Sequence, residues 1–161
     1  MKTEVMFSSK NMSFSTPQDF FDKLNDEFHF TLDACADEFN HKCERYYTAE
    51  QDCLKQDWSG ETVFCNPPYG RNISCFVKKC FDEVYKGRCK CVVLLVHART
   101  DTRWFHDYIY HKAEVRFVKG RLKFGGMVNN APFPSMVVIF RGAGGDEDGR
   151  KADVRKDDCH V

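Results

Sequence analysis

The stretch Thr62-Val63-Phe64-Cys65-Asn66-Pro67-Pro68-Tyr69-Gly70 joins a short apolar run to a rigid polar turn. Residues 62–65 are apolar and β-prone, so they predict a buried strand. Each proline fixes its own φ, lacks an N–H, and pushes the residue before it toward extended conformations. The sequence therefore predicts a strand that ends in a stiff segment, Asn66-Pro67-Pro68-Tyr69, which we call the NPPY segment.

The NPPY segment carries the groups needed to hold an amino group attached to an aromatic ring. The Asn66 amide oxygen and the Pro67 carbonyl oxygen are two neighbouring acceptors, which suit the two hydrogens of an –NH2 group. Holding both hydrogens favours a pyramidal nitrogen, and this frees its lone pair for attack. The Tyr69 ring could stack on the base that carries the amine, which is worth roughly 1–3 kcal/mol. A proline-rich turn that only closes a strand is the alternative reading of these four residues.

Length and composition indicate one globular domain. The chain has 161 residues, of which 42% are hydrophobic, so a sizeable core can form. Lys+Arg and Asp+Glu both number 24, and this balance does not favour strong nonspecific binding to nucleic acid, although a local basic face is compatible with it. The sequence contains neither an apolar run of about 18 residues nor a signal-peptide pattern at its start, so we expect a soluble intracellular protein.

Nine cysteines need an explanation, and no two of them form a C-x-x-C pair. A zinc site favours tighter paired spacings, and a disulfide framework needs an oxidising compartment. We therefore interpret the cysteines as reduced thiols that serve as small apolar residues, and we expect no metal.

The first half of the chain predicts a helix followed by a strand. Residues 1–13 form a flexible lead-in, 14–141 a single domain, and 142–161 a polar, disordered tail. Thr16 is the expected N-cap and Pro17 the first residue of a helix over 17–27. A strand over 28–32 then ends at Asp33, followed by small residues that let a ligand approach the backbone at a strand end.

The second half alternates apolar helices and strands. The spacing of apolar residues predicts a helix over 73–84, and the run 90–96 predicts a buried strand of a parallel sheet. The remaining elements are a short strand at 46–48, a short helix over 104–110, strands at 114–118 and 135–140, and a mobile basic and aromatic loop at 120–126.

Six stretches in this order resemble one known family. They are TPQDFFDKLNDEFHFTLDACAD, DCLKQDW, FCNPPYG, LLVHARTDTRWFH, KGRLKFGG and APFPSMVVIF. Together they resemble the phage-type DNA N6-adenine methyltransferases, often called Dam, over residues 14–141. The resemblance implies an α/β fold: a Rossmann-like S-adenosylmethionine methyltransferase sheet, mostly parallel, with a C-terminal antiparallel hairpin and helices on both faces. It implies methyl transfer from S-adenosylmethionine to N6 of an adenine flipped out of DNA.

The resemblance also implies roles for single residues. Cofactor-binding residues would be Thr16 and Pro17 at the methionine end, Asp33 and Ala34 near the amino group, Asn66, and either Asp52 or Asp57 at the adenine, with Asp52 preferred. The catalytic segment would be Asn66, Pro67, Pro68 and Tyr69. Tyr69 and the lid residue Phe124 would contact the target base, and Arg99, Arg103, Arg121 and Lys123 would contact DNA phosphates.

The chain departs from this family pattern in two respects. The motif after the first strand usually carries glycine, but here it reads Asp33-Ala34-Cys35-Ala36-Asp37. A large target-recognition domain has no room, so sequence reading must come from loops at 97–103 and 119–130 or from a homodimer partner. The same chemistry on RNA adenine or protein glutamine, and a non-catalytic nucleic-acid-binding module of the same fold, are the alternatives.

Overall fold

A computed structural model of the protein describes residues 15–142. The predicted lead-in (1–13) lies outside the described residues, as does the predicted tail (142–161) beyond its first residue. The described chain contains three α-helices, one 3-10 helix and six strands. Among the helices of residues 15–142, none is long and apolar enough to cross a membrane.

The six strands form one mixed sheet in the order β2-β1-β3-β4-β6-β5. The pairs β1–β2, β1–β3 and β3–β4 are parallel, whereas β4–β6 and β5–β6 are antiparallel. The predicted mostly parallel sheet with a C-terminal antiparallel hairpin is therefore present. The strand bounds are β1 Leu32–Asp33, β2 Arg45–Tyr46, β3 Thr62–Cys65, β4 Cys91–His97, β5 Glu114–Phe117 and β6 Ser135–Arg141.

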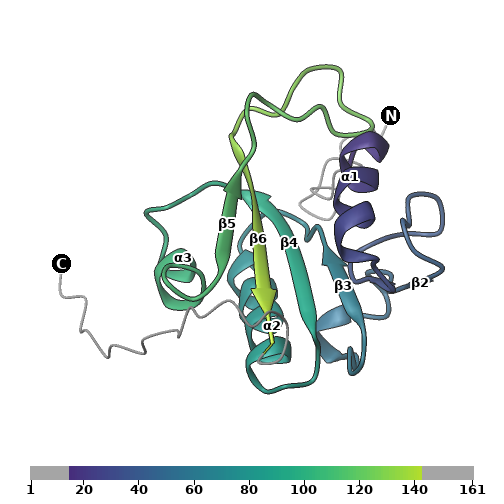
Figure 1. Ribbon diagram of the computed structural model, residues 1–161. Helices are drawn as coiled ribbons and strands as arrows, with labels where there is room; N and C mark the ends of the chain where they lie inside the picture. Colours follow the sequence, from purple (N-terminus) through teal and green to yellow (C-terminus); the bar gives the residue numbers. More distant parts are fainter. Residues whose placement is uncertain (1–14, 143–161) are drawn as a thin grey trace.

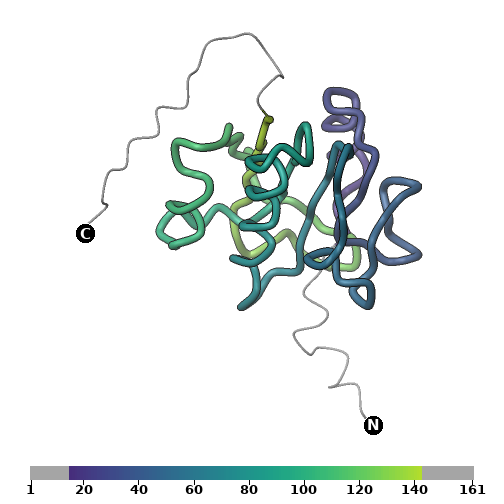
Figure 2. The backbone as a smooth tube through the Cα atoms, turned by 90° about the horizontal axis from the view of Figure 1, so that it is seen from below, coloured from purple at the N-terminus to yellow at the C-terminus, as the bar shows by residue number. Residues whose placement is uncertain are grey.

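Helices cover both faces of the sheet because alternate residues of its central strands point to opposite sides. Val93 and Leu95 of β4 pack in one apolar cluster with Phe21 of helix α1 (Gln18–Phe28). Val92, Leu94 and Val96 pack in the other cluster, with helices α2 (Ile73–Tyr85) and α3 (Arg103–Tyr108). In both backbone views α1 and α3 lie at opposite sides of the molecule (Figures 1 and 2).

The predicted boundaries differ from the observed ones by one or two residues at several elements, and most at the first strand. Phe28 belongs to α1, and the first strand is only Leu32–Asp33 rather than 28–32. His29 adopts a left-handed conformation (φ 55°), and its N–H donates to the Asn25 carbonyl. The Asn25 side chain then accepts from the N–H of Phe30. These two bonds end helix α1 at Phe28 and His29. The alternation of Phe28 and Phe30 instead predicts that this segment belongs to the first strand.

Strand direction gathers several loops at one edge of the sheet. Because β1, β3 and β4 run the same way, their carboxyl ends share an edge. Strand β6 runs against β4 and so begins at that edge, where the loop from β5 to β6 also lies. Figure 1 shows this loop arching over the edge toward the start of α1, where Gly125 N–H donates to the Ser15 carbonyl at 2.8 Å.

Candidate active site

A pocket opens where the carboxyl ends of β1 and β3 meet. The chain leaves β1 for β2 on one side of it and later returns to form β3 on the other side. In open α/β sheets such a reversal of strand order leaves a crevice that binds ligands. The side chains that line the pocket come from the segment before α1, the loop after β1, and the end of β3: Ser15, Thr16, Asp33, Cys35, Asn40, Lys42, Phe64 and Asn66.

Thr16 and Asn66 are joined directly across this pocket. Asn66 Nδ2 donates to Thr16 Oγ1 at 3.0 Å, in a buried bond between residues 50 positions apart. The prediction that Thr16 is an N-cap was wrong, because Pro17 occupies the cap position and the first turn has no side-chain cap. The hydroxyl instead fixes the rotation of the Asn66 amide. Because the Asn66 Nδ2 faces Thr16, the amide oxygen Oδ1 of the same side chain faces away from Thr16.

Asp33 is buried at the pocket wall, with 3% of its surface exposed. Its Oδ2 accepts from the Lys42 N–H at 3.0 Å, while its Oδ1 is buried and has no hydrogen-bond partner among residues 15–142. Burial raises the pKa of this carboxyl from 3.8 to about 6, and backbone N–H groups of Lys42 and Cys35 offset the rise only in part. A buried carboxylate with an unused oxygen suits a cationic ligand group.

The NPPY segment is buried except at its second proline, which is half-buried. Among the described residues 15–142, no backbone N–H donates to the Pro67 carbonyl oxygen. Asn66 and Pro67 carry the two oxygens proposed to hold an amine. They are the first two residues after β3 and so lie at the ligand-binding edge of the sheet. Burial raises the pKa of the Tyr69 phenol well above its usual value, so the ring is neutral at physiological pH.

Tyr69 lies in an aromatic cluster with His97, Phe124 and Phe133. Its ring centroid is 5.0 Å from that of His97, 6.3 Å from that of Phe124 and 5.2 Å from that of Phe133. Phe124 is 1% exposed and packs in the apolar cluster between α1 and the sheet, so it is not an exposed lid. The expected lid residue and the expected stacking residue are thus brought together, edge to face, in a closed arrangement.

The two candidate acids for the cofactor adenine lie in the segment between β2 and β3, and neither lines the pocket. Asp52 accepts from the Leu54 N–H and precedes Cys53, whose sulfur is 3.5 Å from that of the pocket residue Cys35. Asp57 lies five residues before β3, and its carboxylate accepts from the N–H and hydroxyl of Ser59. These bonds lower the Asp57 pKa and tie the side chain into a local turn.

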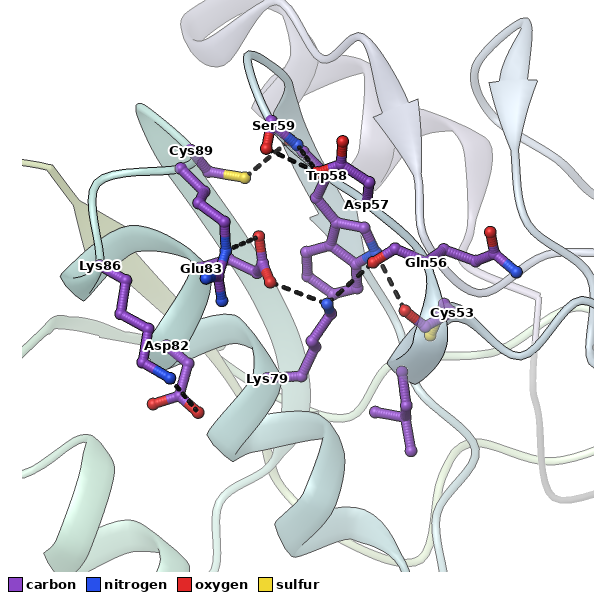
Figure 3. Close-up of polar contacts among 12 residues, drawn as sticks. Cys53, Gln56, Asp57, Trp58, Ser59, Lys79, Asp82, Glu83, Lys86 and Cys89 are labelled. Carbon is purple, nitrogen blue, oxygen red and sulfur yellow. Dashed lines mark hydrogen bonds and ion pairs between the residues drawn. The ribbon is translucent and has the colours of Figure 1, made fainter.

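A buried network holds the segment that carries Asp52 (Figure 3). The Trp58 indole N–H donates to the Cys53 carbonyl at 3.1 Å, which closes the segment behind the 3-10 helix η3 (Cys53–Lys55). Lys79 of α2 lies 5.1 Å from the centre of the Trp58 ring and donates to Gln56 and to the buried carboxylate of Glu83. The position of Asp52 is therefore fixed by α2, the helix that follows the NPPY segment.

The predicted phosphate contacts are exposed and lie toward the same edge. Two of them follow β4 and two belong to the loop between β5 and β6, which share that edge. All four side chains are solvent-exposed: Arg99, Arg103, Arg121 and Lys123. This places positive charge along that edge although the chain as a whole is neutral.

Sequence reasoning missed Ser15, Asn40 and Lys42. Asn40 and Lys42 lie in a polar loop after β1, where Asn40 Oδ1 accepts from the Asp37 N–H and Lys42 Nζ donates to Gln18. Their position directly after the first strand was the available signal, since ligands bind beyond such strand ends.

The eight described cysteines are free thiols, and four of them are buried. Cys35 lies within 3.8 Å of Cys65 as well as 3.5 Å of Cys53, measured between sulfur atoms. Residues 15–142 contain no group of three or more His, Cys, Asp or Glu arranged to hold a metal ion.

Fold and site together are consistent with a methyltransferase: an α/β sheet whose switch-point pocket borders an NPPY segment. A family model described as DNA N-6-adenine-methyltransferase (Dam) matches residues 3–156. The chain belongs to this family. The predicted family and enzyme class, an adenine-specific DNA methyltransferase, are thereby confirmed.

Relatives with this name come from bacteriophages. The chain is 29% identical over 147 residues to a DNA N-6-adenine-methyltransferase of Haemophilus phage HP1, covering 86% of this chain and 83% of the relative. It is 33% identical over 110 residues to one of Escherichia phage T1, covering 67% of this chain and 45% of that protein. A putative methyltransferase of Escherichia coli K12, YfdM, is 43% identical over 61 residues, covering 34% of this chain and 67% of that relative.

Proposed function

We propose that the protein transfers a methyl group from S-adenosylmethionine to N6 of an adenine that is flipped out of DNA. The observation that carries this proposal is the position of Asn66. Its side chain both lines the pocket shared with Asp33 and belongs to the NPPY segment. A cofactor in the pocket and an amine at the NPPY segment would therefore meet at one side chain.

We assign the methionine end of S-adenosylmethionine to this pocket because of the chemistry of its lining. Asp33 offers a buried oxygen without a partner in residues 15–142, which suits a protonated amino group because opposite charges stabilise each other where water is excluded. Thr16 lines the same pocket, and we assign its neighbour Pro17 and the Asp33 neighbour Ala34 to the cofactor site with it. For the cofactor adenine we propose Asp52 rather than Asp57, because the Asp52 neighbour Cys53 contacts the pocket residue Cys35. When bound, the cofactor supplies an electrophilic methyl group on a sulfonium.

The NPPY segment would then prepare the attacking nitrogen. Asn66 Oδ1 and the Pro67 carbonyl accept the two amino hydrogens of adenine, Pro68 stiffens the turn, and Tyr69 contacts the base. Thr16 contributes by holding Nδ2 of Asn66 so that Oδ1 remains the acceptor. No covalent link to the protein is needed, so the cysteines are dispensable for the chemistry.

Flipping the target base costs a few kcal/mol of stacking and pairing. Contacts of Arg99, Arg103, Arg121 and Lys123 with phosphates would offset part of this cost. Tyr69 would contact the base, and Phe124, packed edge to face against Tyr69, would support that ring from the core. We further propose that the enzyme acts in the cytoplasm of the host cell and that a homodimer partner can assist in reading the DNA sequence.

Replacement of Asn66 tests the proposal. Asn66→Ala should nearly abolish methyl transfer while leaving the affinity for S-adenosylmethionine, measured by calorimetry, close to wild type. Asn66→Asp keeps an acceptor oxygen and can accept from the Thr16 hydroxyl, so it should retain part of the activity. The control is Asn72→Ala, at an exposed residue that makes no side-chain cap.

Modified adenines are mapped by sequencing DNA from cells that express each variant. Full methylation by Asn66→Ala would exclude the assigned role.

A further inference from the structure

Three neighbouring strands present polar side chains to the same side of the sheet at the pocket edge. Asn66 follows β3, His97 ends β4 and Ser135 begins β6. His97 and Ser135 are directly opposite each other in the β4–β6 ladder. By alternation His97, Ser135 and Asn66 lie on the face of Val93, Val137 and Phe64, which pack in the α1 cluster. His97 is the last residue of β4, and its ring also reaches Trp104 of the cluster on the other face.

His97 and Ser135 carry buried polar atoms that have no hydrogen-bond partner. His97 Nδ1 and Ser135 Oγ are both shielded from solvent and unpaired in the described chain, and Ser135 is 1% exposed. An unsatisfied buried group costs roughly 1–3 kcal/mol. Two such groups side by side, at the ligand-binding edge, indicate that a bound molecule completes their hydrogen bonds.

The surroundings of these atoms suit a flat heteroaromatic ring. The His97 ring lies 5.0 Å from Tyr69, 5.7 Å from Trp104 and 5.7 Å from Phe133, measured between centroids. Burial, together with the nearby charge of Arg99, lowers the His97 pKa. The imidazole is therefore neutral at physiological pH, and an uncharged base can approach it without meeting an imidazolium.

We infer that His97 and Ser135 recognise the target adenine through a ring nitrogen next to its amino group. This inference rests on the proposed function, in which Asn66 and Pro67 hold the amino hydrogens. Adenine presents acceptor nitrogens on both sides of that amine, N1 and N7. A serine hydroxyl donates to such an acceptor, and the Nδ1–H tautomer of a neutral histidine can do the same. The two residues would thus distinguish adenine from bases that lack an acceptor at that position.

Substrates that lack one ring nitrogen test this inference. Duplexes carry adenine, 7-deazaadenine or 1-deazaadenine at a mapped target position, and kcat/KM is measured for the full-length enzyme. The wild type should lose about tenfold or more on one analogue, which is the usual effect of losing a buried hydrogen bond. Ser135→Ala, and His97→Phe, which keeps a flat ring, should lose a similar factor on adenine and should no longer distinguish adenine from that analogue.

A structural role for these residues predicts different results. Because the Ser135 hydroxyl has no partner among residues 15–142, Ser135→Ala should melt at or above the wild-type temperature. A lower melting temperature would mean that the hydroxyl is bonded internally, against the inference. The matched control is Ser59→Ala at the opposite edge, whose hydroxyl donates to Asp57; it should keep the wild-type preference.

The outcomes separate the two proposals. If the wild type does not methylate adenine at all, the proposed function fails. If it methylates all three bases equally, or if both variants keep the wild-type preference, only the inference about His97 and Ser135 is overturned. If one variant alone loses the preference, the other residue has no part in recognition.

Discussion

Replacing Asp33 by Asn should stabilise the ligand-free protein near neutral pH and weaken cofactor binding. Burial raises the pKa of Asp33 from 3.8 to about 6, so the folded state binds the proton more tightly than the unfolded state does. The contribution of this carboxyl to stability is therefore full below pH 3.8 and is lost as the pH rises through about 6.

The size of the effect follows from the same pKa difference. The gap between 3.8 and about 6, at about 1.4 kcal/mol for each pH unit, corresponds to about 3 kcal/mol above pH 6. Asparagine removes the free-energy cost of burying the charge. Its NH2 group, however, would replace an oxygen that has no partner among residues 15–142, and burying this unpaired donor destabilises the fold in part. We expect Asp33→Asn to gain about 1–2 kcal/mol at pH 7 and almost nothing at pH 4.

Urea unfolding of the full-length chain between pH 4 and pH 8 measures this gain. Wild type, Asp33→Asn and a control, Asp107→Asn at an exposed position, are compared at each pH, so that the titration of other carboxyls cancels. The two Asp33 curves should coincide near pH 4 and separate as the pH passes 6. Calorimetry with S-adenosylmethionine at pH 7 should show at least a tenfold loss of affinity for Asp33→Asn.

Two results would refute this reasoning separately. A lower stability of Asp33→Asn at pH 7 would mean that the hydrogen bonds from Lys42 and Cys35 outweigh the cost of burying the charge. Unchanged cofactor affinity would remove Asp33 from the proposed binding site, whatever its effect on stability.

Three further changes test other parts of the site. Gly125→Ala should reduce methyl transfer, because its new Cβ would lie 2.9 Å from the Ser15 Cβ, and adding Ser15→Gly should restore the rate. Thr16→Val keeps the shape but removes the acceptor that orients Asn66, so kcat should fall about tenfold with a smaller change in the KM for cofactor. Replacing Arg121 and Lys123 by Gln should weaken DNA binding and reduce the salt slope of log K by about 0.9 for each phosphate that is no longer neutralised.

Each of these three has an outcome that contradicts it. Failure of Ser15→Gly to rescue Gly125→Ala would show that crowding against Ser15 is not the cause. An equal loss of cofactor affinity and kcat in Thr16→Val would assign Thr16 to the cofactor alone. A salt slope that matches wild type would mean that Arg121 and Lys123 do not contact phosphate.

The sequence predicted the elements whose apolar pattern matches their burial. Strand β4 is a continuous apolar run because both of its faces are covered, and helix α2 shows its buried face at spacings of three and four. The short strand β1 was misplaced because Phe28 and Phe30 alternate as a strand would. The end of α1 is instead decided by Asn25, whose side chain closes the helix. The local pattern of apolar residues cannot distinguish a helix end from a strand here, since Phe28 and Phe30 are compatible with either.

The sequence predicted the parts of the site whose conformation is determined by neighbouring residues. It predicted less well the parts that depend on contacts between residues far apart in the chain. The NPPY segment follows β3 as expected, because its prolines and the strand before it are local features. The Thr16-Pro17 pair looks like an ordinary helix start, yet the Thr16 hydroxyl bonds Asn66. The glycines near Phe124 suggested a mobile loop, but Gly125 is instead the point of close approach to Ser15.

Two consecutive residues therefore connect the loop between β5 and β6 with the NPPY segment. The Ser15 carbonyl accepts from Gly125 of that loop, and the Thr16 hydroxyl accepts from Asn66. Arg121 and Lys123 belong to the same loop. If they bind DNA as proposed, a displacement of the loop would act on Ser15 and so on its neighbour Thr16, which accepts from the Asn66 amide. Gly125→Ala adds a β-carbon against Ser15 and changes the position of the loop. Thr16→Val removes the hydroxyl that orients the Asn66 amide. The two variants therefore separate the effect of loop position from that of amide orientation. If both act through Asn66, combining them should cost little more than the larger single effect, since the same bond cannot be broken twice.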